Sequence, residues 1–228
     1  MTRSAPLRLG VLFSGAGTNL KAILDACERR AIDAEVRVAI TNRPAAPGIQ
    51  FGRDHGVPTL VFARADYPSR AAQQAAMADA LVEHEVELAV TPGLDQILRG
   101  AFQERFDGPR FNIHPSLLPA FGGGLHAARD ALDWGAKVTG VTVHFSTDDL
   151  DAGPIILQEA LPIEEGDTEE SLMTRIHEVE HRLLPAAIQL FAEDRLQIEG
   201  RRVRILPPQP VRPEALEEQA PGKGQDRG

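Results

Sequence analysis

An asparagine and a histidine spaced two residues apart could act together on one small ligand. Asn112 and His114 flank Ile113 at the end of a short apolar run, and Pro115 follows at once. On an extended chain residues i and i+2 point to the same face, so the amide and the imidazole would lie side by side. An amide can polarise a carbonyl and an imidazole can move a proton. The alternative is that both side chains only form structural hydrogen bonds with backbone groups of the following loop.

A second polar segment, an acidic loop at 146–154, follows a predicted strand at 137–145. Asp148, Asp149 and Asp151 lie within four residues and could hold Ca²⁺ or Mg²⁺. The loop lacks the glycine and the distal glutamate of an EF-hand, and no His or Cys spacing is typical of a zinc site. We therefore predict no metal.

A glycine-containing turn at 15–19 separates a buried strand at 9–14 from a helix at 20–28. Backbone N–H groups at such a turn and the positive end of the helix dipole can bind a phosphate. An ordinary strand-to-helix turn with a capping residue is the alternative. A dinucleotide site needs a third glycine and an acidic residue at the end of the next strand, whereas Leu20 and the segment 41–43 stand there. A mononucleotide phosphate therefore fits better.

Strands and helices alternate along most of the chain, which predicts an α/β fold with a doubly wound, mainly parallel sheet. The predicted strands lie at 9–14, 34–41, 58–62, 86–91, 137–145 and 155–158, with a short one ending at 114, and the predicted helices at 20–28, 48–55, 69–84, 127–134 and 171–191. We predict one domain over 7–206 that ends in a small hairpin at 197–205, and a disordered tail at 207–228, which has too few apolar residues to offset its ordering entropy. Ligands of such sheets bind at the carboxyl ends of the strands, which would bring 14–19, 91–97 and 112–119 together.

The bulk composition narrows the class of protein and its partners. Of the 228 residues 43% are hydrophobic and 25% charged, with a net charge of -9, so broad binding to nucleic acid is not expected. No apolar run is long enough to cross a bilayer, and no secretory signal is evident. Cys27 is the only cysteine. We predict a cytoplasmic protein, a monomer or homodimer, that acts on small molecules without membrane binding.

The segment N-I-H-P-S-L-L-P at 112–119 resembles the signature of the folate-dependent formyltransferases, and D-D-L-D-A-G-P at 148–154 is similar to its downstream partner. The resemblance runs from about residue 7 to about residue 208. It implies a Rossmann-like formyltransferase fold and catalysis by Asn112, His114 and Asp151 acting together. His144, in a V-H-F segment, is then a pocket residue near Asp151 or simply a polar residue of a half-buried strand.

Within this family the chain resembles the members that move a formyl group from the cosubstrate 10-formyltetrahydrofolate to the amine of glycinamide ribonucleotide in purine synthesis. The resemblance implies nucleotide-binding residues in the glycine turn and on the last helix: Gly17, Thr18, Asn19, His177 and Glu180. It implies folate-binding residues mainly in two loops: Arg70, Leu94, Asp95, Gln96, Ile97, Leu98, Asn112, Thr147, Asp148 and Asp151. His177 and Glu180 could instead belong to a solvated helical face.

One segment departs from the family pattern, and the role of one glycine-rich segment is open. Relatives usually have Phe-Met-Arg where this chain has Leu94-Asp95-Gln96, and the missing arginine bears on folate affinity. Three glycines at 122–124 predict either a mobile lid or a long turn. The rival functions are a 10-formyltetrahydrofolate hydrolase, in which water replaces the amine, and a non-catalytic nucleotide-binding paralogue. A formyltransferase acting on methionyl-tRNA would need a nucleic-acid-binding domain and a basic surface.

Overall fold

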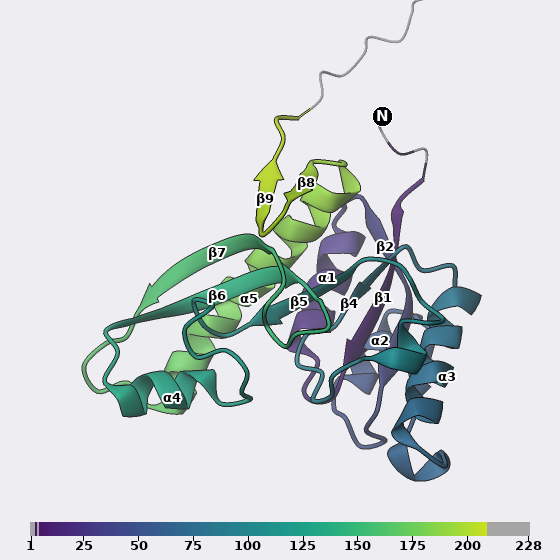
Figure 1. The fold of residues 1–228 in the computed structure, drawn as a ribbon, viewed down its shortest axis with the longest axis horizontal. Helices are drawn as coiled ribbons and strands as arrows, with labels where there is room; N and C mark the ends of the chain where they lie inside the picture. The colour runs from purple at the N-terminus through teal and green to yellow at the C-terminus, as the bar shows by residue number, and fades with distance from the viewer. Residues whose placement is uncertain (1–2, 4, 209–228) are drawn as a thin grey trace, which may run out of the picture.

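The computed structural model describes residue 3 and residues 5–208, and Figure 1 shows how its elements are arranged. The strands are β1 (Leu7–Phe13), β2 (Ala34–Thr41), β3 (Thr59–Val61), β4 (Leu88–Val90), β5 (Arg110–His114), β6 (Val138–Phe145), β7 (Ile155–Pro162), β8 (Leu196–Glu199) and β9 (Arg202–Ile205). The α-helices are α1 (Thr18–Glu28), α2 (Ile49–Asp54), α3 (Arg70–Glu83), α4 (Ala127–Trp134) and α5 (Glu169–Ala192), with short 3₁₀ helices η1 (Arg64–Asp66) and η2 (Gly100–Phe102).

All the strands join one sheet in the order β3-β2-β1-β4-β5-β6-β7-β9-β8. The strands from β3 to β5 run parallel, and β6 and β7 continue the sheet antiparallel. β9 pairs parallel with β7 and antiparallel with β8. The predicted α/β fold with a mainly parallel sheet and a terminal hairpin is confirmed, and β7 is longer than the predicted strand at 155–158.

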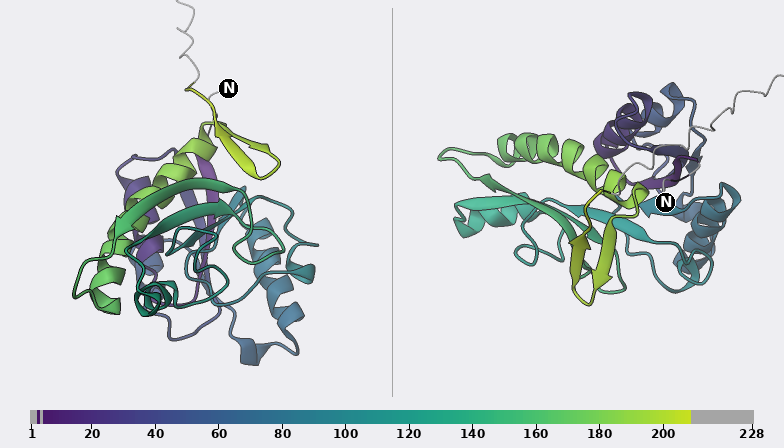
Figure 2. Two further views of the ribbon diagram at one scale, coloured as in Figure 1. Left: turned by 60° about the vertical axis from the view of Figure 1, so that its left-hand side comes forward. Right: turned by 90° about the horizontal axis from the view of Figure 1, so that it is seen from above.

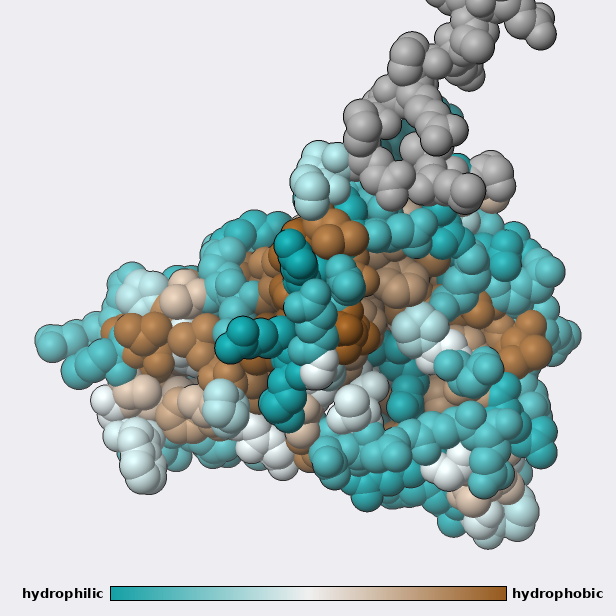
Figure 3. Space-filling view, turned by 45° about the horizontal axis from the view of Figure 1, so that its top comes forward, coloured by the Kyte–Doolittle hydropathy of each residue, from teal (hydrophilic) through white to brown (hydrophobic). Residues whose placement is uncertain are grey.

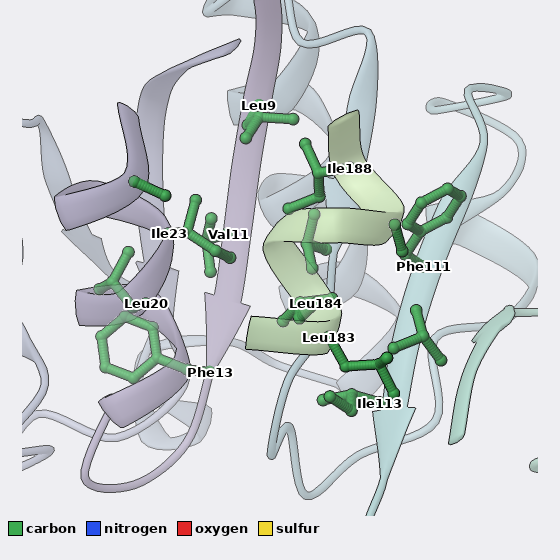
Figure 4. Packing of buried hydrophobic residues seen from close by; sticks show 14 of the residues in the cluster. Leu9, Val11, Phe13, Leu20, Ile23, Phe111, Ile113, Leu183, Leu184 and Ile188 are labelled. Atoms are coloured by element: carbon green, nitrogen blue, oxygen red, sulfur yellow. The ribbon is translucent and has the colours of Figure 1, made fainter. Parts of the chain in front are cut away.

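Both faces of β1 are buried because helices cover both faces of the sheet. Leu9, Val11 and Phe13 point toward α1 and α5, where they pack with residues such as Leu20 and Leu184 (Figure 4). Leu12 belongs to a second buried cluster formed with α3 and η2. Figure 2 shows α1 and α5 on one side of the sheet and α3 on the other. This two-faced burial is the doubly wound arrangement that the alternation of elements predicts.

α5 has a defined start and a long buried face. The Thr168 side chain accepts the N–H of Ser171, and the Ser171 side chain accepts the N–H of Thr168, which closes a capping box. α5 then packs on α1, β6 and β7. Its buried side chains therefore fix which residues it presents to the carboxyl end of β1.

The antiparallel end of the sheet is more open than the parallel end. Val138 on β6 and Ile198 on β8 are 50% and 51% exposed. On the face drawn in Figure 3, hydrophobic residues gather in a band across the middle of the molecule among hydrophilic ones.

Among the residues described, no helix has the length and apolar character needed to span a membrane. Apart from residues 207 and 208, the tail predicted to be disordered lies outside the described residues.

Candidate active site

Three polar side chains from β5 and the β6–β7 loop converge on one point. His114 Nδ1 lies 3.4 Å from Asp151 Oδ2, and the amide nitrogen of Asn112 lies 3.5 Å from Asp151 Oδ1. His114 and Asp151 are almost fully buried, each with 6% of its side chain exposed. Asp151 has a left-handed backbone with φ of 51°, which turns its carboxylate back toward β5. One carboxylate therefore orients the amide and the imidazole together.

The glycine-rich loop after β5 contacts both His114 and Asp151. The backbone carbonyl of Phe121 lies 2.9 Å from His114 Nε2, and the N–H of Gly123 donates to Asp151 Oδ2 at 2.9 Å. Both ring nitrogens of His114 thus face acceptors, so an imidazolium can donate at each. The loop is folded over the side chains that the sequence assigns to chemistry.

His144 on β6 lies next to these residues and is buried, with 2% exposed. Its Nδ1 is 2.9 Å from the carbonyl of Phe145, which leaves Nε2 to face the Asn112 amide nitrogen at 3.4 Å and Asp151 Oδ1 at 3.7 Å. Burial lowers the pKa of His144, against opposing effects from the Phe145 carbonyl and the Asp151 charge. A neutral His144 accepts a hydrogen bond from Asn112, so the structure favours the pocket interpretation of this residue over that of a merely half-buried strand histidine.

The loop that follows His114 is held by buried hydrogen bonds rather than by packing alone. The Thr142 hydroxyl donates to the carbonyl of Ser116 at 2.7 Å and accepts the N–H of Leu118 at 3.1 Å. Gln158 donates to the Leu118 carbonyl at 2.9 Å, and the Leu118–Pro119 peptide bond is cis. β6 and β7 therefore fix the shape of the loop on the side away from the cavity.

A cavity of about 480 Å³ joins these side chains to the glycine turn (Gly15–Asn19) after β1. It is lined by that turn, by the end of β5 with Asp151, by the segment 92–97, and by Met173, His177 and Glu180 of α5. The strand order places β1, β4 and β5 side by side, so their carboxyl ends meet at one edge of the sheet. Segments distant in sequence thus line one hollow.

The glycine turn has a backbone that a larger residue would strain. Gly17 precedes the first residue of α1 and has φ of 72°. A Cβ atom on Gly17 would lie 2.6 Å from the Cα of Gly48, whose N–H donates to the carbonyl of Gly15 at 3.3 Å. The close approach of the two glycines keeps the turn in place. Its N–H groups border the cavity at the positive end of α1.

Glu180 is a buried carboxyl group at this end of the cavity, with 5% exposed. Burial raises its pKa to about 7, although a hydrogen bond of 2.8 Å from the Asn19 amide opposes the shift. His177, one helical turn earlier, has its pKa lowered by burial. The bond from Asn19 to Glu180 ties α1 to α5 across the cavity wall.

Residues 7–188 match the protein family described as formyl transferase. The chain belongs to this family. A crystal structure of glycinamide ribonucleotide transformylase 1 from Symbiobacterium toebii has a TM-score of 0.87 at 51% identity, and the match covers 90% of this chain and 96% of that one. The phosphoribosylglycinamide formyltransferase of Escherichia coli (strain K12) is 37% identical over 210 residues, covering 89% of this chain and 97% of that protein.

The trifunctional purine biosynthetic protein adenosine-3 of Gallus gallus is 41% identical over 192 residues. The chain spans only 19% of that relative's length, and the same share of the corresponding proteins of Bos taurus and Homo sapiens. The resemblance to the formyltransferases that the segments at 112–119 and 148–154 carry is confirmed.

A second, smaller hollow of about 70 Å³ adjoins the large cavity. It contains most of the residues to which the family resemblance assigns folate: Leu94, Gln96, Ile97, Leu98, Asn112, Thr147 and Asp151. His144 and Arg110 also line it. Asp95 borders the large cavity instead, where its carboxylate is bonded to Ser14. In this formyl transferase most of the predicted folate residues thus line one or both of two adjoining hollows.

Two predicted folate residues lie elsewhere. Arg70 is an exposed residue in the first turn of α3. Asp148 is exposed on the β6–β7 loop and pairs with the Gln103 side chain. Neither residue lines either of the two cavities. A contact from either side chain to a ligand in these cavities would need a movement of its loop or side chain.

The structure also places residues in the site that the sequence did not single out. Met173 lies on α5 at the spacing of His177 and Glu180, so the helical period alone could have found it. Leu125 and Leu150 line the large cavity from two loops. The backbone groups of the loop over His114 leave no signal in a sequence, because every residue type offers a carbonyl.

One group of metal-ligating side chains occurs among the described residues, and it lies outside both cavities. Asp25, Glu28 and His55 bring their ligand atoms within 4.8 Å of one another at the surface between α1 and α2. Asp25 is already bonded to the Lys21 ammonium group at 2.7 Å. None of the three borders the site, whose polar groups are an amide, an imidazole and a carboxylate.

Proposed function

We propose that the chain transfers the formyl group of 10-formyltetrahydrofolate to the amine of glycinamide ribonucleotide, giving N-formylglycinamide ribonucleotide and tetrahydrofolate in de novo purine synthesis. One observation carries the proposal. The convergence of Asn112, His114 and Asp151 borders the same cavity as the glycine turn and Glu180. A single hollow can therefore hold a phosphorylated amine and a formyl donor next to each other. The relatives named above support this choice of substrates.

In the proposed reaction the amine attacks the formyl carbon, and a tetrahedral oxyanion forms. Collapse breaks the bond between that carbon and the folate nitrogen. The amine loses a proton and the folate nitrogen gains one. Asn112 exchanges its 3.4 Å contact with His144 for one with the oxyanion, to which it donates that N–H, and a preorganised donor of this kind is typically worth about 10²–10³ in rate. His114 turns Nε2 from the Phe121 carbonyl to the substrate as the loop that carries Phe121 moves aside, stabilises the same oxygen and passes a proton to the departing nitrogen.

Asp151 has an orienting role in this mechanism. Its two oxygens face Asn112 and His114 separately, so it fixes the orientation of both side chains. An ordered water beside it would take up the proton of the attacking amine. The reaction forms no covalent enzyme intermediate, and the residues at the site accomplish it by positioning and proton transfer.

The two ends of the large cavity suit the two parts of the nucleotide substrate. The glycine turn offers backbone N–H groups for its phosphate. Glu180 and His177 on α5 border the same end, and in this proposal they contact the ribose and the phosphate. The formyl donor would then lie along Leu94–Leu98 and the β6–β7 loop, toward the smaller hollow.

A direct assay tests the proposal and its rivals. The protein is mixed with 10-formyltetrahydrofolate and glycinamide ribonucleotide, and tetrahydrofolate release is followed. We expect release only when both substrates are present. Release without the nucleotide would indicate a hydrolase, and nucleotide binding without any release would indicate a non-catalytic paralogue. A cytoplasmic location, a monomeric or homodimeric state and independence of metal ions stay predictions, which fractionation, sedimentation and assays with a chelator can test.

A further inference from the structure

Ser14 connects the glycine turn to a side chain outside it. It lies between β1 and the turn and is buried, with 5% exposed. Its hydroxyl lies 2.7 Å from Asp95 Oδ1 and accepts the backbone N–H of Asp95 at 2.9 Å. The N–H of Ser14 also donates to the carbonyl of Gly93 at 3.3 Å. The loop after β4 therefore grips the start of the turn through both backbone and side chain.

The Asp95 carboxylate also accepts hydrogen bonds from a third loop. The Asn42 amide donates to Oδ1 at 2.7 Å, and the Arg43 guanidinium group pairs with Oδ2. Asn42 and Arg43 follow β2, and β2, β1 and β4 are neighbours in the sheet. Burial by itself would raise the pKa of Asp95, but the hydrogen bonds from Ser14, Asn42 and Arg43 outweigh it and lower the pKa. One carboxylate thus joins three adjacent strand ends.

We propose that Asp95 is a positioning residue for the nucleotide substrate, acting through Ser14 to hold the glycine turn in its phosphate-binding shape. This inference rests on the proposed function for its substrate. Asp95 would not touch the nucleotide itself. The contact between Asp95 and Ser14 would thus brace the turn.

The composition of the turn explains why such a brace matters. Gly15–Asn19 contains no lysine or arginine, so a phosphate there depends on the direction of backbone N–H groups. Misplacement of such donors by about 1 Å is costly in a preorganised site. A carboxylate near a bound phosphate would also repel it unless neutralised, and the pairing with Arg43 supplies that neutralisation.

The family resemblance implies that Asp95 binds folate directly. The same contacts limit how it could do so. Oδ1 accepts from Ser14 and Asn42, and Oδ2 pairs with Arg43. Oδ1 therefore has two protein partners and Oδ2 has one. A folate donor could reach only Oδ2 without displacing a protein partner.

Steady-state kinetics of Asp95→Ala, Asp95→Asn and Ser14→Ala tests the proposal. We expect Asp95→Ala to raise KM for glycinamide ribonucleotide about tenfold, and kcat and KM for 10-formyltetrahydrofolate to change by less than about twofold. Asp95→Asn keeps an oxygen for Ser14 and Asn42, so it should recover part of the loss. The double variant with Ser14→Ala should lose less than the sum of the two single losses, because the variants share the Ser14–Asp95 contact, although Ser14 also contacts Asn42 Oδ1 at 2.7 Å.

Hydrogen exchange of the ligand-free protein gives a readout that does not depend on turnover. In Asp95→Ala the amides that hold the turn, those of Ser14, Lys21 and Gly48, should exchange about tenfold faster, with little change in β6 and β7. Asp79→Asn is the matched control, because it breaks an exposed pair between a carboxylate and Arg105 that does not involve the turn. This control should alter neither the exchange of the turn nor either KM.

The outcomes separate the inference from the function on which it rests. An unchanged KM for the nucleotide together with unchanged exchange in the turn would overturn the proposal. A rise in KM for the folate alone would overturn it in favour of a direct folate contact. If the parent protein releases no tetrahydrofolate with both substrates, the proposed function fails, and faster or unchanged exchange of the turn still decides whether Asp95 braces it.

Discussion

The two ends of the large cavity are built from different groups. At the glycine turn the groups proposed to bind the substrate are mainly backbone N–H donors, positioned by two close glycines and by a buried carboxyl group on α5. At the end of β5 they are side chains, Asn112, His114 and Asp151, from a strand and a loop. Truncating a side chain at the β5 end removes a chemical group, whereas a change at the turn displaces groups that remain. The first should lower kcat and the second should raise KM.

The largest effects should come from the β5 end. We expect His114→Ala and Asp151→Asn each to lower kcat by about 10²–10⁴, because proton transfer and imidazole orientation are lost. Nucleotide binding, measured by calorimetry, should persist, since the glycine turn is intact. Near-normal turnover in either variant would contradict the assigned roles and remove the contrast between the two ends.

Glu180 should make stability depend on pH. Its folded pKa of about 7 lies above the ordinary value of 4.5, so the folded state holds the proton more tightly. The stabilisation that comes with this proton is complete below about pH 4.5 and is lost as the pH rises to about 7, a change of up to about 3 kcal/mol. Glu180→Gln should remove this dependence.

Denaturant unfolding of the parent and of Glu180→Gln at pH 5 and pH 8 measures this effect. The variant should gain stability relative to the parent at pH 8. A difference between the two proteins that is the same at both pH values would show that Glu180 does not carry a raised pKa.

The backbone character of the turn can be tested with one methyl group. Gly17→Ala adds a Cβ that would lie 2.6 Å from the Cα of Gly48, at a positive φ that disfavours alanine. Strain of about 1–3 kcal/mol should raise KM for the nucleotide tenfold or more and leave kcat nearly unchanged. Gly56→Ala is the control, because Gly56 also has a positive φ but has open space around it outside the cavity. An equal rise in KM in both variants would argue against a local effect.

The smallest effect should come from Asp148. Its side chain is exposed and lines neither cavity, so Asp148→Asn should change kcat/KM for the folate by less than about twofold. A tenfold loss would show instead that the acidic loop closes on the folate through this side chain. Initial rates over a series of folate concentrations distinguish the two outcomes.

Much of the framework was predictable because local patterns carry it. The run from β1 to α1 is an apolar strand, a glycine turn and a periodic helix, and the structure has these elements within two residues. The spacing of Asn112 and His114 predicts a shared face, and both side chains reach the Asp151 carboxylate. The predicted contact of Arg70 with folate comes from the resemblance alone, and no local pattern supports it.

The remainder depends on contacts between distant segments. Asp95 follows β4, and nothing near it in sequence indicates that its carboxylate meets Ser14 and Asn42. The raised pKa of Glu180 needs the burial that α1 and α5 create together. The left-handed backbone of Asp151 and the carbonyl of Phe121 are conformational facts that residue identity does not specify.

The sequence by itself determined the succession of strands and helices along the chain, the glycine turn and the pairing of an amide with an imidazole. It could do so because side-chain periodicity and glycine conformation are local properties. The family resemblance named Asp151 as the partner of that pair, and only the tertiary structure decided its contacts with them, which carboxyl group is buried beside the turn, and which loops share one carboxylate. Those choices are made by the order of strands in the sheet, which brings chain ends together across long sequence separations and excludes water around them.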